Sequence, residues 1–97
     1  MSQIPRLLEV LSSTRSDALS IVEGEPISLL RPDGARAITK QPLTAALWRA
    51  LMTELVAPSV VESLVDGEPQ EHVAFSAGAE YTVRLWRQES VGRAEVR

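Results

Sequence analysis

The side chains in this sequence best suited to binding chemistry are four arginines near the end of the chain: Arg84, Arg87, Arg93 and Arg97. A guanidinium group can donate two parallel, charge-assisted hydrogen bonds to a phosphate or a carboxylate. One interpretation is therefore that one or two of these arginines reach such a group on a partner. The alternative is that they are ordinary exposed strand charges neutralised by Glu80, Glu89 and Glu95, because surface ion pairs are common and contribute little.

Trp86 stands among these arginines, and on a β-strand it would share a face with Arg84. Tryptophan is enriched in protein–protein interfaces, where its large ring packs against a partner. We therefore predict that Trp86 is an interface residue.

Residues that could carry out catalysis are isolated or missing. The single histidine, His72, has no second metal ligand at helical or strand spacing, and the sequence contains no cysteine. The only lysine, Lys40, does not belong to a phosphate-binding loop, since Gln41 follows it. The glutamates of residues 23–25 and 68–71 stand beside Gly or Pro, which is typical of solvated loops rather than of paired acid–base catalysts. We predict a binding or coupling module without a complete catalytic site, metal or cofactor of its own.

Length and composition indicate one folded domain. The 97 residues are 44% hydrophobic and 24% charged, as in ordinary globular proteins. The net charge of −3 gives no general attraction to nucleic acid or to an anionic membrane. No apolar run approaches the roughly 20 residues of a membrane span, and the first residues lack the features of a signal peptide. We expect a cytoplasmic protein that neither binds nucleic acid nor inserts directly into a membrane.

Apolar residues at helical spacing predict three helices. The first lies within residues 1–14, and the second follows the N-cap Thr44. The apolar stripe of the second helix is expected to comprise Leu47, Leu51 and Leu55, widened by Trp48 and Met52. Pro58 interrupts that helix, Ser59 can cap a third helix, and Gly67 is a natural end for it.

Alternating apolar residues before and after these two helices predict antiparallel strands joined by short turns. In chain order, the expected strands are residues 19–22, 27–30 and 36–39, one that contains Val73 and Phe75, one that contains Tyr81, Val83 and Leu85, and residues 93–97. The expected turns are Arg31–Gly34, Ala77–Gly78 and Ser90–Gly92. The fold class is therefore predicted as α+β, with an antiparallel sheet of about five to six strands and helices packed on one face.

Because side chains alternate along a strand, one face of this sheet must cover the core. The residues expected on the core face are Leu19, Ile21, Ile27, Leu29, Val73, Phe75, Tyr81, Val83 and Leu85. The residues expected on the opposite face are Thr82, Arg84, Trp86 and Gln88. We expect the functional surface on this second face.

Several short motifs resemble the N-terminal domain of the motor ATPases of type IV pili and type II secretion, the PilT, PilB and GspE group. In order, they are Asp17-Ala18-Leu19-Ser20-Ile21, Gly24-Glu25-Pro26, Arg31-Pro32-Asp33-Gly34, Pro42-Leu43-Thr44, the strand Tyr81–Gln88, and Val96-Arg97. The corresponding family motifs are Ser-Asp-Leu-His-Leu, Gly-x-Pro, Arg-Val-Asp-Gly, Pro-Leu-Thr, Arg-Phe-Arg-Val-Asn-x-Phe-Arg-Gln and a terminal Phe-Arg. The resemblance covers residues 17–97, and its strength lies in the order and spacing of the motifs.

The resemblance implies that residues 1–97 form a single PAS-like domain, which in that family precedes a RecA-like ATPase domain absent from these residues. It also implies a bacterial protein that acts in twitching motility or secretion as a non-catalytic coupling and oligomerisation domain of a hexameric motor. Its partner would be the motor ATPase domain of the same or a neighbouring subunit, at the inner-membrane base of a pilus or secretion machine. ATP and Mg²⁺ would be bound by the motor. Arg97 matches the family's terminal arginine, which approaches the phosphates, and Arg84 and Arg87 are its neighbours.

The sequence departs from the family at three positions: Ser20, Glu80 and Thr82 replace the family's His, Arg and Arg. These replacements favour an alternative function, a free-standing protein-interaction or regulatory module with the same fold. A third possibility is a small-molecule sensor, because PAS-like folds often hold ligands between sheet and helices. It is the weakest, since no convergent set of polar residues accompanies an apolar pocket in the sequence.

Overall fold

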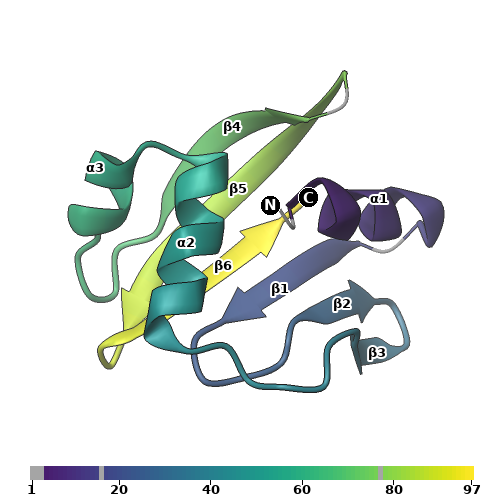
Figure 1. The fold of residues 1–97 in the computed structure, drawn as a ribbon, viewed down its shortest axis with the longest axis horizontal. Coiled ribbons are helices and arrows are strands. Elements are labelled where there is room, and N and C mark those ends of the chain that lie inside the picture. The colour runs from purple at the N-terminus through teal and green to yellow at the C-terminus, as the bar shows by residue number, and fades with distance from the viewer. Residues whose placement is uncertain (1–3, 16, 77) are drawn as a thin grey trace.

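The computed structural model describes residues 4–15, 17–76 and 78–97 of the chain. Within them, one helix is followed by three strands, two helices and three further strands (Figure 1). In chain order the elements are α1 (Ile4–Ser13), β1 (Ala18–Val22), β2 (Ser28–Arg31), β3 (Gly34–Ala37), α2 (Ala45–Leu55), α3 (Pro58–Glu62), β4 (Gln70–Ser76), β5 (Ala79–Gln88) and β6 (Val91–Val96).

The strands form one antiparallel sheet in the order β3-β2-β1-β6-β5-β4. Two three-stranded meanders, β1–β3 and β4–β6, are joined where the first and last strands pair, with Leu19 opposite Val96 and Ile21 opposite Ala94. Figure 1 shows α1 and α2 lying over the same face of this sheet. The predicted α+β class, with helices on one face of an antiparallel sheet, is confirmed.

Helix α1 lies inside the range predicted for the first helix, and α2 begins directly after its predicted N-cap. The stripe of α1 is buried, and it comprises Ile4, Leu7, Leu8 and Leu11. The helix lies inside the predicted range 1–14, of which residues 1–3 fall outside the described part of the chain. The backbone N–H of Leu47 donates a 3.2 Å hydrogen bond to the side-chain oxygen of Thr44, which is therefore the N-cap of α2.

Among the described residues, no helix has the length and apolar character needed to cross a bilayer.

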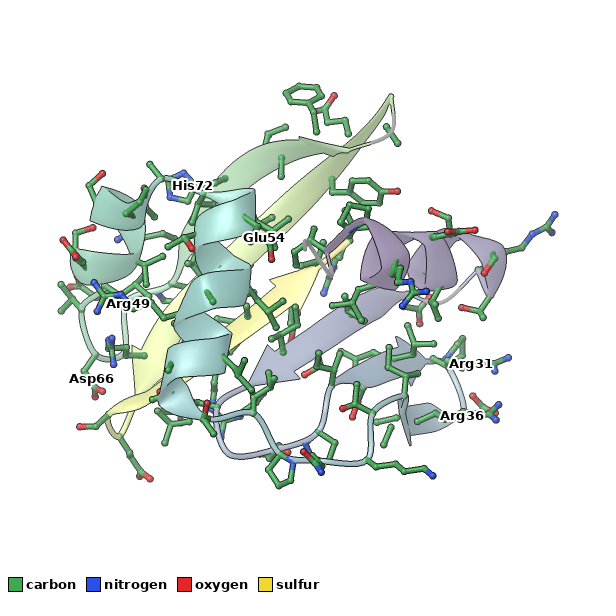
Figure 2. All side chains as sticks on the ribbon, in the orientation of Figure 1. Arg31, Arg36, Arg49, Glu54, Asp66 and His72 are labelled. Atoms are coloured by element: carbon green, nitrogen blue, oxygen red, sulfur yellow. The ribbon has the colours of Figure 1, made fainter. Side chains whose placement is uncertain are left out.

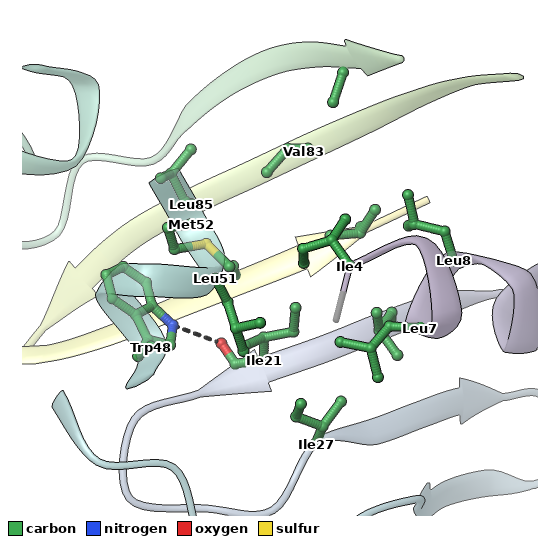
Figure 3. Packing of buried hydrophobic residues seen from close by; sticks show 14 of the residues in the cluster. Ile4, Leu7, Leu8, Ile21, Ile27, Trp48, Leu51, Met52, Val83 and Leu85 are labelled. Carbon is green, nitrogen blue, oxygen red and sulfur yellow. Dashed lines mark hydrogen bonds between the residues drawn. The ribbon is translucent and has the colours of Figure 1, made fainter. Parts of the chain in front are cut away.

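Trp48 is a central residue of the core. Its side chain is 1% exposed, and its indole nitrogen donates a 3.0 Å hydrogen bond to the Ile21 carbonyl oxygen, which ties α2 to β1 (Figure 3). Met52 is fully buried one turn later, whereas Leu47 is 51% exposed. The prediction that Leu47 belongs to the buried stripe is wrong. Residues at i, i+4 and i+8 drift around a helix with 3.6 residues per turn, so the stripe of leucines does not stay on one face.

The third helix and the four strands with predicted bounds differ from those bounds, by one residue in β1 and β2 and by more in β3 and β6. Helix α3 begins at Pro58 rather than at a Ser59 cap, because the first helical position needs no N–H, and it ends before Gly67. Strand β3 begins directly after a two-residue turn, since Gly34 already pairs with Arg31. Strand β6 begins at Val91, inside the predicted turn. Of the predicted Ala77–Gly78 turn, Ala77 lies outside the described residues.

The largest error concerns the face of β4. Val73 and Phe75, expected in the core, are 52% and 76% exposed, while Ala74 between them is only 5% exposed. Ala74 stands opposite Tyr81, which packs against the core, so Ala74 and His72 of β4 face the helices. The predicted alternation is present, but the predicted core face of β4 is wrong, because the small Ala74 gives a weaker hydrophobic signal than its larger neighbours.

Candidate functional site

The candidate site lies on the open face of the sheet, which we define as the face opposite α1 and α2. The helix-covered face is identified by fully buried side chains such as Ile21, Val83 and Leu85 (Figure 3). Residues one position away on each strand therefore point the other way. Thr82, Arg84 and Gln88 are exposed on the open face and Trp86 is partly buried there, as predicted.

Strand register brings charged residues from three strands into one row on this face. Arg84 of β5 stands directly opposite Glu71 of β4 and Glu95 of β6. Despite these neighbours, Arg84 forms no ion pair among the described residues; its guanidinium carbon lies 5.8 Å from the centroid of the Trp86 ring. This is a cation–π distance, so Trp86 holds Arg84 along the sheet surface without neutralising it. The charge of Arg84 therefore remains available to a ligand.

Arg97 joins Arg84 at a shallow hollow of about 250 Å³. The hollow is lined by Glu71, Thr82, Arg84, Glu95 and Arg97. The backbone of Arg97 is fixed by two reciprocal 2.9 Å hydrogen bonds with Thr82, and its guanidinium lies 3.4 Å from the Glu95 carboxylate. The Arg97 side chain is 66% exposed, so this ion pair is weak and can be exchanged for another anion.

Exposed apolar side chains border the hollow on one side. Val73 stands opposite Thr82, and Phe75 stands opposite Glu80 two residues further along β4. Directly paired residues on neighbouring strands point to the same side of a sheet, so Val73 and Phe75 both lie on the open face. Large exposed aromatic residues next to arginines are typical of protein-binding surfaces. The sequence pattern does not reveal this feature, because large apolar residues at alternate positions predict the core face for both.

The structure separates the four arginines of the terminal region. Arg93 stands opposite Trp86 and therefore shares the open face with Arg84 and Arg97. Arg87 stands opposite Gly92, whose Cα faces the Trp48 ring on the helix-covered side. Arg87 is thus on the other face of the sheet and cannot act in the same hollow. The role of each arginine remains a prediction, but of these four only Arg84 and Arg97 line the same hollow.

The open face carries charged and apolar side chains. No group of three His, Asp or Glu side chains among the described residues is arranged to hold a metal ion. His72 faces the helices opposite Val83, where its imidazole lies 3.2 Å from the Gln70 side chain. The hollow on the open face instead holds two arginines and two glutamates, with apolar side chains nearby. These groups could give up their contacts within the chain and form contacts with a partner.

No protein-family model and no curated protein matches this sequence. Among solved structures, the whole chain matches part of the ATPase DotB of Legionella pneumophila, with a TM-score of 0.79 and 19% sequence identity. It also matches part of the pilus retraction motor PilT with bound ADP, with a TM-score of 0.77 and 11% identity. All of this chain is covered in both comparisons, and it spans 29% of each of those chains. The resemblance to the motor ATPases is therefore confirmed at the level of the fold.

Proposed function

We propose that this chain is a non-catalytic coupling domain of a bacterial type IV pilus or type II secretion motor ATPase. The observation that carries the proposal is the open sheet face, where Arg84, which forms no ion pair among the described residues, and the exposed Arg97 line one hollow. The exposed Val73 and Phe75 lie on the same face. The fold shared with parts of DotB and PilT supports the same assignment. Such a domain acts at the cytoplasmic, inner-membrane base of a pilus or secretion machine.

In this proposal, the open face packs on the ATPase domain of the same or a neighbouring subunit, in a homo-hexameric ring. The motor domain binds ATP and Mg²⁺, and this chain supplies positive charge. Arg97 exchanges its exposed Glu95 contact for a phosphate oxygen, and Arg84 leaves the Trp86 ring to do the same. Both exchanges replace weak internal contacts with charge-assisted hydrogen bonds in a more enclosed environment. The position of the domain thus depends on the nucleotide state of its neighbour.

The test is to mix this chain with a purified motor ATPase core from the same bacterium and to measure co-sedimentation and ATP turnover. Arg84→Ala and Arg97→Ala should reduce the effect of the chain on turnover, and each should change stability by no more than about 0.5 kcal/mol, because both side chains are exposed. Arg6→Ala, which removes an exposed arginine from α1, is the matched control and should have no effect. Equal turnover with all three variants would contradict the proposed role of the open face.

A second candidate function is a free-standing interaction or regulatory module. It is favoured by Thr82, which lines the hollow at a position where the family resemblance implies an arginine. A module of this kind would bind its partner through the exposed Val73 and Phe75 without sensing nucleotide. Binding to the motor core that is identical with ATP, ADP or no nucleotide would support this alternative.

A further inference from the structure

A second surface with unbalanced charge lies on the helix-covered side, at the far edge of the sheet. There a groove of about 400 Å³ separates the end of α1 from the β2–β3 hairpin. Its apolar lining consists of Val10, Leu29, Ala37 and Ile38. Arg31 and Arg36 complete the wall; Figure 2 shows both at the hairpin, away from the α2–α3 region that holds Arg49.

Strand register explains why both arginines face this groove. Arg36 stands opposite Leu29, whose side chain is buried on the helix-covered side. Arg31 is two residues beyond Leu29 on the same strand, so it points to the same side. Because β3 is the edge strand and its residues are exposed, no further strand covers this end of the groove. This surface is on the opposite side of the sheet from the open face, so the inference does not depend on the proposed function.

The positive charge of the groove is poorly compensated. Arg31 lies 3.9 Å from Asp33, whose side chain is 84% exposed, and such a pair contributes little. The guanidinium of Arg36 has no ion pair or hydrogen bond among the described residues. Thr14, at the rim, donates its hydroxyl hydrogen to the Val10 carbonyl oxygen at 2.7 Å. An anion in the groove would therefore be held by the two arginines.

We propose that this groove binds an acidic segment of a partner protein in which Asp or Glu alternates with aliphatic residues. The two guanidinium groups would take carboxylates, for which their planar geometry is suited. The aliphatic residues would cover the lining of Val10, Leu29 and Ile38, which a free phosphate would leave in contact with water. The groove runs beside an exposed edge strand, so an extended segment fits it better than a compact ligand.

The probe is a fluorescein-labelled synthetic peptide, Leu-Glu-Leu-Glu-Leu, with Leu-Gln-Leu-Gln-Leu as the uncharged control. Fluorescence anisotropy should show saturable binding of the acidic peptide and at least tenfold weaker binding of the control, as expected for the loss of charge-assisted hydrogen bonds. Arg36→Ala should weaken binding about tenfold and Arg36→Lys less, because lysine keeps the charge but not the planar fork. Arg49→Ala removes an exposed arginine from α2, away from the groove, and as the control it should bind like the unmodified chain.

A second measurement does not depend on any variant. In ¹⁵N–¹H spectra of the unmodified chain, the peptide should shift the amide signals of Val10, Leu29 and Ile38, while those of Thr82 and Arg97 on the open face stay in place. Unchanged affinity in Arg36→Ala, or shifts confined to the open face, would overturn the proposal. Equally strong competition by inorganic phosphate or by free glutarate would also overturn it, because either would identify a simple anion site. Absence of any spectral shift at about 1 mM peptide would do the same.

Discussion

Gly92 of β6 lies directly beneath the ring of Trp48: a Cβ atom placed on Gly92 would come within 2.9 Å of three carbon atoms of the indole. The ring cannot easily move away, because Trp48 is 1% exposed and its nitrogen is bound to the Ile21 carbonyl oxygen. This contact fixes the distance between α2 and the sheet. The backbone conformation of Gly92 does not itself require glycine. The close contact with Trp48 explains why glycine stands at this position of the β5–β6 hairpin.

We expect Gly92→Ala to lower the free energy of unfolding by about 1–3 kcal/mol, the usual cost of overpacking a core. Urea denaturation of the two proteins measures this change. In combination with Trp48→Phe, which shortens the ring, the cost should be smaller than the sum of the two single costs. Strict additivity would mean that the contact between Gly92 and Trp48 does not limit packing.

Leu51 and Leu47 form a matched pair on α2, because the same substitution removes a buried side chain at one position and an exposed one at the other. Leu51 is 6% exposed and Leu47 is 51% exposed. Leu51→Ala should cost about 2–5 kcal/mol of stability through loss of burial and formation of a cavity. Leu47→Ala should change stability by no more than about 0.5 kcal/mol. Thermal or urea unfolding that ranks the two variants in the opposite order would contradict the orientation of α2.

The N-cap of α2 provides a test of local structure. Thr44→Ala removes the acceptor of the Leu47 N–H and should cost about 1 kcal/mol, whereas Thr44→Ser should restore most of that stability. Thr53→Ala is the control inside the same helix, where the threonine hydroxyl only bonds back to the Ala50 carbonyl oxygen and alanine is the better helix former. Circular dichroism during denaturation gives all three values. A loss for Thr53→Ala equal to that for Thr44→Ala would argue against specific capping.

The substitution Phe75→Ala tests whether Phe75 is a binding residue or a core residue. Because Phe75 is 76% exposed, Phe75→Ala should alter the free energy of unfolding by no more than about 0.5 kcal/mol. The same substitution of a buried phenylalanine would lower that free energy by about 3–5 kcal/mol. If the open face binds a motor ATPase core, the same variant should weaken co-sedimentation about tenfold or more, because aromatic anchors dominate interface energies. Unaltered co-sedimentation would show that Phe75 does not belong to the interface. The arginines would then be tested separately.

Much of the secondary structure could be predicted because its signals are local. The stripe of α1, the cap at Thr44 and the turn before Gly34 each depend on neighbouring residues, and each is present in the structure. The shared face of Arg84 and Trp86 is equally local, since it follows from alternation along a single strand. The start of α3 is harder to predict, because a proline can either break a helix or stand as its first residue, as Pro58 does.

The element order, the antiparallel hairpins and the exposed side of β5 follow from the amino-acid sequence alone. The side of β4 that faces the helices depends on the assembled sheet, because a strand with apolar residues on one side and a small residue on the other is oriented by its pairing with β5. The tertiary structure also brings Arg97, directly after β6, to the same hollow as Arg84 of β5, since residues on adjacent strands come together only once the register is fixed. The groove at Arg31 and Arg36 likewise required α1 to pack beside the hairpin, a long-range contact that no local pattern encodes.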